Sequence, residues 1–173
     1  MLKRPQTSEY NPYAEKYIEL VPDGNLLDIL KKQQEETNDL LRNVSKEQGE
    51  YRYEEGKWSL KEVVGHMADI ERVMSYHLLV AARGDRTTLP SFDKDVFVMN
   101  AEFNRMRLED ITLNFSIVRQ CTCSLFASIP SDAWMRTGTI LNHETTARAL
   151  AYIIAGHELH HRSIIKERYL SLI

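Results

Sequence analysis

Three of the six histidines have the spacing of metal ligands. His157 and His161 are four residues apart, and in a helix this spacing places both imidazoles on one face, one turn apart. His66 lies beside the apolar face of a separate segment with helical periodicity. Neutral imidazole binds zinc, nickel, copper or iron, and three protein ligands leave a position for water or substrate. These residues therefore form a candidate metal site in the core of a helical bundle.

The same histidines also allow a structural interpretation. A helical H-x-x-x-H pair occurs by chance, and a buried histidine such as His66 is commonly a hydrogen-bonded core residue. His160 could replace a ligand in an i, i+3 pair, but it turns about 60° away from His157, which favours a supporting or exposed position. His77 follows His66 by three turns, roughly 16 Å, which is too far to share one ion. His143 lies in an expected loop and indicates nothing further.

Two glutamates close to the histidines could take part in chemistry. Residues 157–161 read H-E-x-x-H, the zincin pattern, in which Glu158 would be the general base. We do not favour a metalloprotease, because no histidine follows His161 and no strand-rich half precedes the pattern. Glu62 can either hydrogen-bond an imidazole or complete a capping box with Ser59, and both interpretations stay open. No catalytic residue is assigned from the sequence.

Four segments with helical periodicity must position these residues. The second begins at the Ser59 capping box and ends at Gly84, and the third ends at Pro130. Strand signals are scarce, which predicts an all-α four-helix bundle and one domain over residues 1–173. Residues 84–104 are less regular and are expected to pack back onto the bundle, in part as a short helix, and residues 131–143 are expected to be a connection. The periodic segments are about 26–44, 60–82, 109–128 and 146–170.

Composition is typical of a soluble globular protein. The chain has 173 residues, 43% apolar and 27% charged, with a net charge of −3, so it offers no basic footprint for nucleic acid. Cys121 and Cys123 are two residues apart, about 200° around a helix, and cannot form a disulfide, as expected in a reducing compartment. Residues 1–16 lack a secretory signal, and the longest apolar run, 149–156, is too short to cross a bilayer. We expect a cytoplasmic protein with no membrane partner.

Two motifs resemble the signatures of the DinB/YfiT-like superfamily. Residues 53–69, YEEGKWSLKEVVGHMAD, resemble its second-helix signature, and residues 155–162, AGHELHHR, resemble its last-helix signature. Their order and separation also fit, and the resemblance extends over residues 25–170.

This resemblance implies an up-down-down-up bundle with a long crossover after the second helix. It also implies a metal triad made of one histidine from the second helix and an H-x-x-x-H pair from the last. Carried over residue by residue, these ligands are His66, His157 and His161, which would hold a divalent transition metal, zinc or nickel. Members of the family are often homodimers, so a homodimer is expected.

The resemblance further implies an enzyme of small molecules. Characterised relatives include S-transferases and isomerases that use bacillithiol, mycothiol or glutathione, and others are described as metal-dependent hydrolases. We expect an S-transferase in which the metal holds a low-molecular-weight thiol as thiolate for attack on an electrophile, such as an epoxide, halide or activated alkene. The alternatives are a hydrolase that uses metal-bound hydroxide and a non-enzymatic metal-containing protein that binds a ligand or partner in a stress response.

Overall fold

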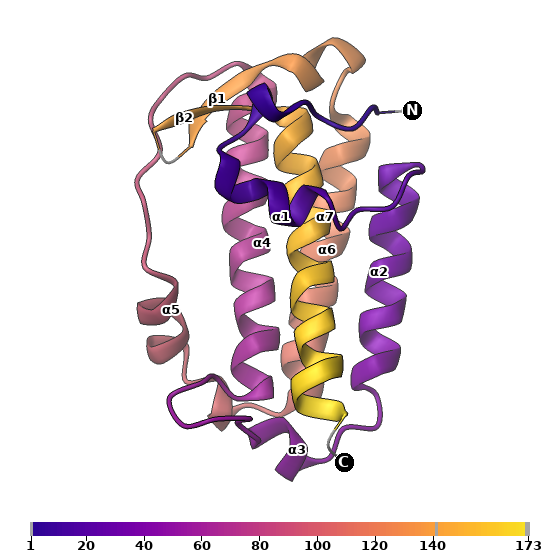
Figure 1. Ribbon diagram of the computed structural model, residues 1–173, viewed down its shortest axis with the longest axis vertical. Helices are drawn as coiled ribbons and strands as arrows, with labels where there is room; N and C mark the ends of the chain where they lie inside the picture. The colour runs from indigo at the N-terminus through magenta and orange to yellow at the C-terminus, as the bar shows by residue number, and fades with distance from the viewer. Residues whose placement is uncertain (1, 141, 172–173) are drawn as a thin grey trace.

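Four long helices make up the body of the protein (Figure 1). The computed structural model describes residues 2–140 and 142–171. α4 packs against α6 and α7, and α2 packs against the same two helices from the other side. The predicted four-helix bundle is therefore confirmed. The bundle helices are α2 (Leu26–Leu41), α4 (Leu60–Arg83), α6 (Leu108–Ser128) and α7 (Ala147–Ile164).

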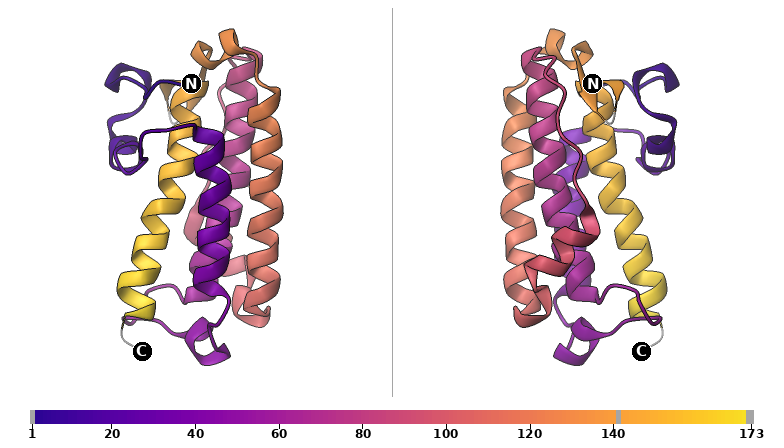
Figure 2. Two further views of the ribbon diagram at one scale, coloured as in Figure 1. Left: turned by 90° about the vertical axis from the view of Figure 1, so that its right-hand side faces the viewer. Right: turned by 90° about the vertical axis from the view of Figure 1, so that its left-hand side faces the viewer.

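The helices follow the expected up-down-down-up order. In Figure 1, α2 and α7 run in one direction and α4 and α6 run together in the other. Because α4 and α6 are parallel, residues 84–107 must return along the whole bundle to join them, and Figure 2 shows this crossover beside the helices. The crossover contains the expected short helix, α5 (Lys94–Ala101), and one 3₁₀ turn at Phe103–Arg105.

Local sequence signals fix both ends of α4. The Ser59 hydroxyl accepts the Glu62 N–H at 3.2 Å, and the Glu62 carboxylate accepts the Ser59 N–H at 2.7 Å. This is the predicted capping box, which satisfies two N–H groups at the helix start. Gly84, with φ of 75°, ends the helix in the left-handed region that favours glycine.

The shorter elements correct three expectations. The first predicted helix ends at Leu41 instead of Val44, and α3 (Lys46–Glu50) begins at the capping residue Ser45. The expected connection at 131–143 contains a strand, because residues 137–140 pair with residues 143–146 in a hairpin that is rich in β-branched threonine. The last helix changes to π-helical turns at residue 165. These elements are α1 (Glu15–Ile18), β1 (Thr137–Ile140), β2 (His143–Thr146), 3₁₀ turns at Thr7–Glu9, Pro12–Ala14 and Ser131–Met135, and a π-helix at Ile165–Leu170.

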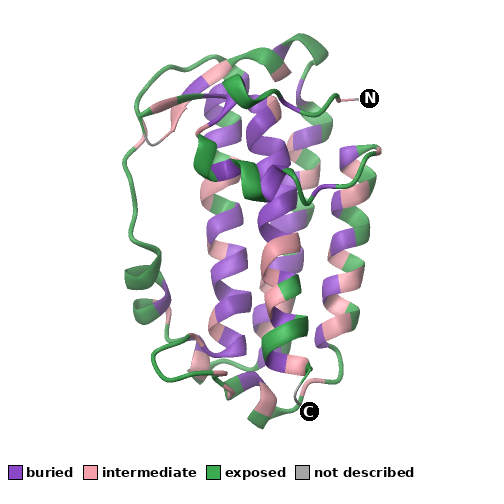
Figure 3. Cartoon of the chain, viewed as in Figure 1, coloured by how far each residue is buried: buried purple, intermediate pink, exposed green. Residues whose placement is uncertain are grey.

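Buried residues line the facing sides of the bundle helices (Figure 3), and the apolar ones form two clusters. One surrounds Leu78 and Leu150, beneath the hairpin. The other surrounds Phe115 and Leu60, near the start of α4. Polar side chains lie between the clusters, and the largest of them, Arg119, has no exposed surface.

A hydrogen-bonded network in this polar layer connects the four bundle helices. Arg119 on α6 donates to both carboxylate oxygens of Glu71 on α4, at 2.7 and 2.8 Å. It also donates at 3.1 Å to the Leu30 carbonyl and to the Gln33 side chain on α2. Gln33 in turn donates to the Ala155 carbonyl on α7 at 3.1 Å. Because each buried charge has a partner, the layer can persist inside an apolar core.

None of the helices in the described part of the chain combines the length and apolarity that a bilayer span requires. The cytoplasmic location stays a prediction. So does the single domain over residues 1–173, of which residues 1, 141, 172 and 173 lie outside the described part.

Candidate metal centre

The three predicted histidines meet between α4 and α7. Each residue offers one ring nitrogen, and these three nitrogens lie within 4.8 Å of one another. The ring centroid of His66 lies 5.3 Å from that of His157 and 4.9 Å from that of His161. The ring centroids of His157 and His161 are 4.5 Å apart. Three imidazoles at these separations can reach one ion, so the arrangement fits a transition metal. Their role as ligands stays a prediction.

Each of His66 and His157 directly follows a glycine, and at both glycines another segment of the chain lies against the helix. A Cβ atom on Gly65 would lie 2.4 Å from the ring of Phe103, which comes from the end of the crossover. A Cβ atom on Gly156 would lie 2.0 Å from the carbonyl oxygen of Tyr17. Both distances are far below van der Waals contact, so only glycine allows these segments to approach the helices this closely.

The electrostatics of the site keep the imidazoles neutral. Burial lowers the pKa of His66 to about 4, with a smaller effect of the Lys94 ammonium. Burial, and then the neighbouring His66, lower the pKa of His161 to about 3, and burial also places the pKa of His157 well below its usual range. Neutral imidazoles keep a lone pair for a metal. The buried Nδ1 of His161 has no hydrogen-bond partner in the described part of the protein, as expected of an atom reserved for an absent ligand.

Aromatic side chains surround the histidines in a cavity of about 720 Å³. The Trp58 ring centroid is 4.7 Å from that of His66, so this residue forms a wall of the site beside its packing on the core. Tyr17 on α1 packs edge-on against His157 at 5.6 Å and against His160 at 5.4 Å. His160 therefore lies beside the three-histidine cluster without belonging to it.

Two lysines bring positive charge to the same cavity. Lys16 Nζ lies 3.9 Å from the ring centroid of Tyr13 and 4.9 Å from that of Tyr17. Lys94, at the start of α5, lies 4.9 Å from the Trp58 ring centroid and pairs with Asp95 at 2.9 Å. Each ammonium group is attracted to the negative face of the aromatic ring beside it. Asp93 and Asp95 line the cavity as well, so their negative charges balance those of the two lysines.

Neither of the two neighbouring glutamates faces the metal site. Glu62 is occupied by the capping box and by Asn104, whose side chain donates to it at 2.8 Å. Glu158 is buried against α2, where it accepts a hydrogen bond from Thr37 and lies 3.4 Å from Arg162. Because these contacts hold its carboxylate against α2, Glu158 does not take the place of the general base of a zincin-like site.

Several residues of the cavity were not predicted from the sequence. Tyr13, Lys16 and Tyr17 come from the N-terminal segment, and Phe92 and Lys94 come from the crossover. The tyrosines at i and i+4 before the first bundle helix were the available signal, since this spacing gives a short helix one aromatic face.

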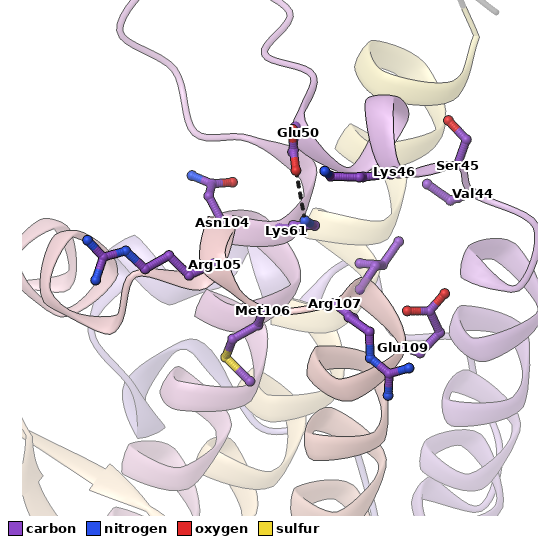
Figure 4. A pocket seen from close by; sticks show the side chains of 11 residues that line it. Val44, Ser45, Lys46, Glu50, Lys61, Asn104, Arg105, Met106, Arg107 and Glu109 are labelled. Atoms are coloured by element: carbon purple, nitrogen blue, oxygen red, sulfur yellow. Dashed lines mark hydrogen bonds and ion pairs between the residues drawn. The ribbon is translucent and has the colours of Figure 1, made fainter.

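A separate cavity of about 400 Å³ lies where α3 meets the start of α6 (Figure 4). Its lining is basic, but the charges are compensated. The buried Lys61 pairs with Glu50 at 3.2 Å, and Arg105 and Arg107 each pair with a carboxylate three residues away. None of the described histidines lines this cavity, so it is distinct from the metal centre.

Comparison with known proteins supports the same fold. The sequence profile of the DinB superfamily matches residues 29–165. The structure is similar to that of YfiT from Bacillus subtilis, described as a probable metal-dependent hydrolase with an unusual four-helix bundle topology. That match has a TM-score of 0.74 and 14% identity, and it covers 98% of this chain and 93% of YfiT.

A second similar structure is that of the mycothiol-dependent maleylpyruvate isomerase. The TM-score is 0.66 at 13% identity, over 84% of this chain and 61% of the isomerase. No curated protein gives a significant match to the sequence. At these identities the structural likenesses establish the bundle and its topology.

Proposed function

Because this chain belongs to the DinB superfamily, we propose that it is a metal-dependent S-transferase, with a divalent metal held by His66, His157 and His161. The observation that carries the proposal is the convergence of three neutral imidazoles, one of which has a buried nitrogen without a partner. Zinc or nickel suits three imidazoles equally well.

Such an ion, when bound, would supply the positive charge that lowers the pKa of a coordinated thiol or water toward neutrality. The chain's own residues supply the surroundings. The rings of Trp58 and Tyr17 pack against the imidazoles of His66 and His157 and supply an apolar wall on these sides of the cavity. Lys94 is paired with Asp95, whereas Lys16 supplies a positive charge that can pair with an anionic group on the bound molecule, such as the carboxylate of a thiol. Neither cysteine of the chain lines the cavity, so the reacting sulfur would come from a substrate.

The description of the second similar structure as mycothiol-dependent supports thiol chemistry. The description of YfiT as a probable metal-dependent hydrolase supports the alternative, hydrolysis at the same three histidines. In that case water would replace the thiol, and Lys16 would hold the leaving acid. A protein that holds metal without turnover would be the third, non-enzymatic possibility.

The first test is metal content by elemental mass spectrometry of protein purified without chelator. We expect about one equivalent of zinc or nickel per chain, the ratio for one three-ligand site, and its loss in His161→Ala. His143→Ala is the matched control, because His143 lies in β2 and outside the three-histidine cluster. Absence of metal from the wild-type chain, even after incubation with both ions, would refute the proposal.

The second test separates the reaction classes. Metal-loaded protein is incubated with 1-chloro-2,4-dinitrobenzene and each of several thiols, and separately with p-nitrophenyl esters alone. An S-transferase consumes thiol and electrophile together, with no turnover when thiol is omitted. Ester hydrolysis without thiol would establish the alternative instead.

A homodimer is part of the proposal only through the family resemblance. Sedimentation equilibrium of the full chain over a range of concentrations gives its mass in solution. A mass of one chain, 20.1 kDa, at every concentration would exclude the dimer.

A further inference from the structure

A second cavity adjoins the metal centre and is almost entirely apolar. It has a volume of about 200 Å³ and lies between α4, α7, the hairpin and the crossover. For comparison, a dry apolar cavity of about 150 Å³ inside a protein takes up benzene. We call this cavity the apolar chamber. Its apolar lining includes Val73, Leu89, Pro90, Ile140, Leu150 and Ile153.

The apolar chamber and the metal cavity share a boundary. Tyr13, Tyr17, Met74 and Phe92 line both of them. These side chains come from the N-terminal segment, α4 and the crossover. The two cavities are therefore neighbours, and these four side chains separate them.

Besides the two tyrosines, the polar side chains that line the apolar chamber are Asn11, His77, Ser91 and Thr145, and of these four His77 is the one that a bundle helix supplies. It is 91% buried, because its exposed fraction is 9%, and its imidazole makes no hydrogen bond within residues 2–140 and 142–171. A neutral imidazole has one N–H donor and one acceptor, and both ring nitrogens of His77 keep some accessible surface, so they can pair with a bound molecule. His77 follows His66 on α4 by three turns, or roughly 16 Å along the axis. It thus lines the apolar chamber and not the metal cavity.

We propose that the apolar chamber binds the electrophilic substrate, an organic molecule with an apolar body and a carbonyl or hydroxyl oxygen that hydrogen-bonds to His77. The identification of this ligand as the electrophile rests on the proposed function; the binding itself does not. The apolar lining supplies affinity by removing the body of the molecule from water. His77 supplies selectivity, because its unpartnered imidazole favours a ligand with an oxygen over a hydrocarbon of the same shape.

The test uses metal-free protein and a matched pair of probes, acetophenone and ethylbenzene, which differ by one carbonyl group. Binding is measured by isothermal titration calorimetry, with the His77 ring resonances as a second readout. We expect both compounds to bind and acetophenone to bind about fivefold more tightly, as one net hydrogen bond gives. In His77→Leu this preference should disappear while ethylbenzene still binds. In Val73→Trp, which fills the chamber from a half-buried position, binding of both should be lost.

Wild-type protein that binds neither probe would overturn the inference, and so would a preference for acetophenone that survives in His77→Leu. His143→Leu is the control and should bind both probes as the wild type does. Because neither metal nor turnover is needed, the two proposals fail separately. Probe binding by a chain that never takes up metal refutes the proposed function alone, and metal uptake without probe binding refutes this inference alone.

Discussion

Replacing Glu71 with methionine should destabilise the fold strongly, because it leaves the Arg119 guanidinium charged inside the core. Arg119 has no exposed surface, and Glu71 accepts two of its hydrogen bonds, at 2.7 and 2.8 Å. The two remaining hydrogen bonds, to the Leu30 carbonyl and Gln33, are to neutral groups, and the other carboxylate that acts on Arg119, that of Glu158, makes no hydrogen bond with it in the described part of the chain. Removing one partner of a buried ion pair costs about 3–5 kcal/mol. In a chain of this size we expect the melting temperature to fall by roughly 6–20 °C.

The assay is equilibrium unfolding in urea, followed by far-ultraviolet circular dichroism. The matched variant is the double substitution Glu71→Met, Arg119→Met, which removes both charges and should come within about 1 kcal/mol of the wild type. Asp110→Met breaks an ion pair on the surface and should cost less than about 1 kcal/mol. The reasoning is refuted if Glu71→Met loses less than about 1 kcal/mol, or if the double variant is as unstable as the single one.

Three further predictions concern the segments that hold the N-terminus and α7. Gly156→Ala places a Cβ atom 2.0 Å from the Tyr17 carbonyl oxygen, so the free energy of unfolding should fall by about 1–3 kcal/mol and metal uptake should weaken. An unchanged free energy of unfolding and unchanged metal uptake would contradict the close approach. Thr146→Ala removes the α7 cap on the Ala149 N–H at 3.0 Å and should cost about 1–2 kcal/mol in urea unfolding, whereas Thr146→Ser should retain most of this. Burial raises the pKa of Glu9, but hydrogen bonds from Arg148, Gln6 and Thr146 outweigh this effect, so the pKa is lowered in the folded state. The ionised Glu9 therefore stabilises the fold fully above its unfolded-state pKa of 4.5, and this contribution is lost as the pH falls through the folded-state pKa. Glu9→Gln should thus cost about 1–3 kcal/mol in thermal unfolding at pH 7 and much less near pH 3, and an equal cost at both would disprove the linkage.

The sequence predicted most accurately what short-range chemistry decides. Ser59 and Glu62 are three residues apart and cap the same helix, so their pairing depends on no distant residue. The spacing of His157 and His161 likewise fixes one shared face of α7. That His66 reaches the same point depends on the packing of α4 against α7. Periodicity shows that each helix has an apolar face, but it does not show which helix covers that face, and here the family resemblance supplied the pairing.

The remaining features depend on contacts between residues far apart in the sequence. Arg119 and Glu71 look like polar interruptions of their helices until α4 and α6 are placed side by side. The hairpin at 137–146 has two strands of four residues, too short to show alternation clearly. From the sequence alone, Gly156 only lowers the helix propensity of α7. The contact that requires a glycine there is with the backbone of Tyr17, which lies in a segment with little periodicity of its own.

The parallel direction of α4 and α6 has a consequence for how this protein can change. The chain must travel back along the bundle between them, and it brings Phe92 and Lys94 to the cavities on the way. Within the crossover at 84–107, only Val98 and Phe103 are buried, whereas the histidines lie on helices fixed by the core. Mutations in 85–97 can therefore reshape the walls that meet a substrate at little cost to folding. The cavity walls from the crossover and the three histidines of the proposed metal site thus belong to different parts of the fold, and one can vary while the other stays the same.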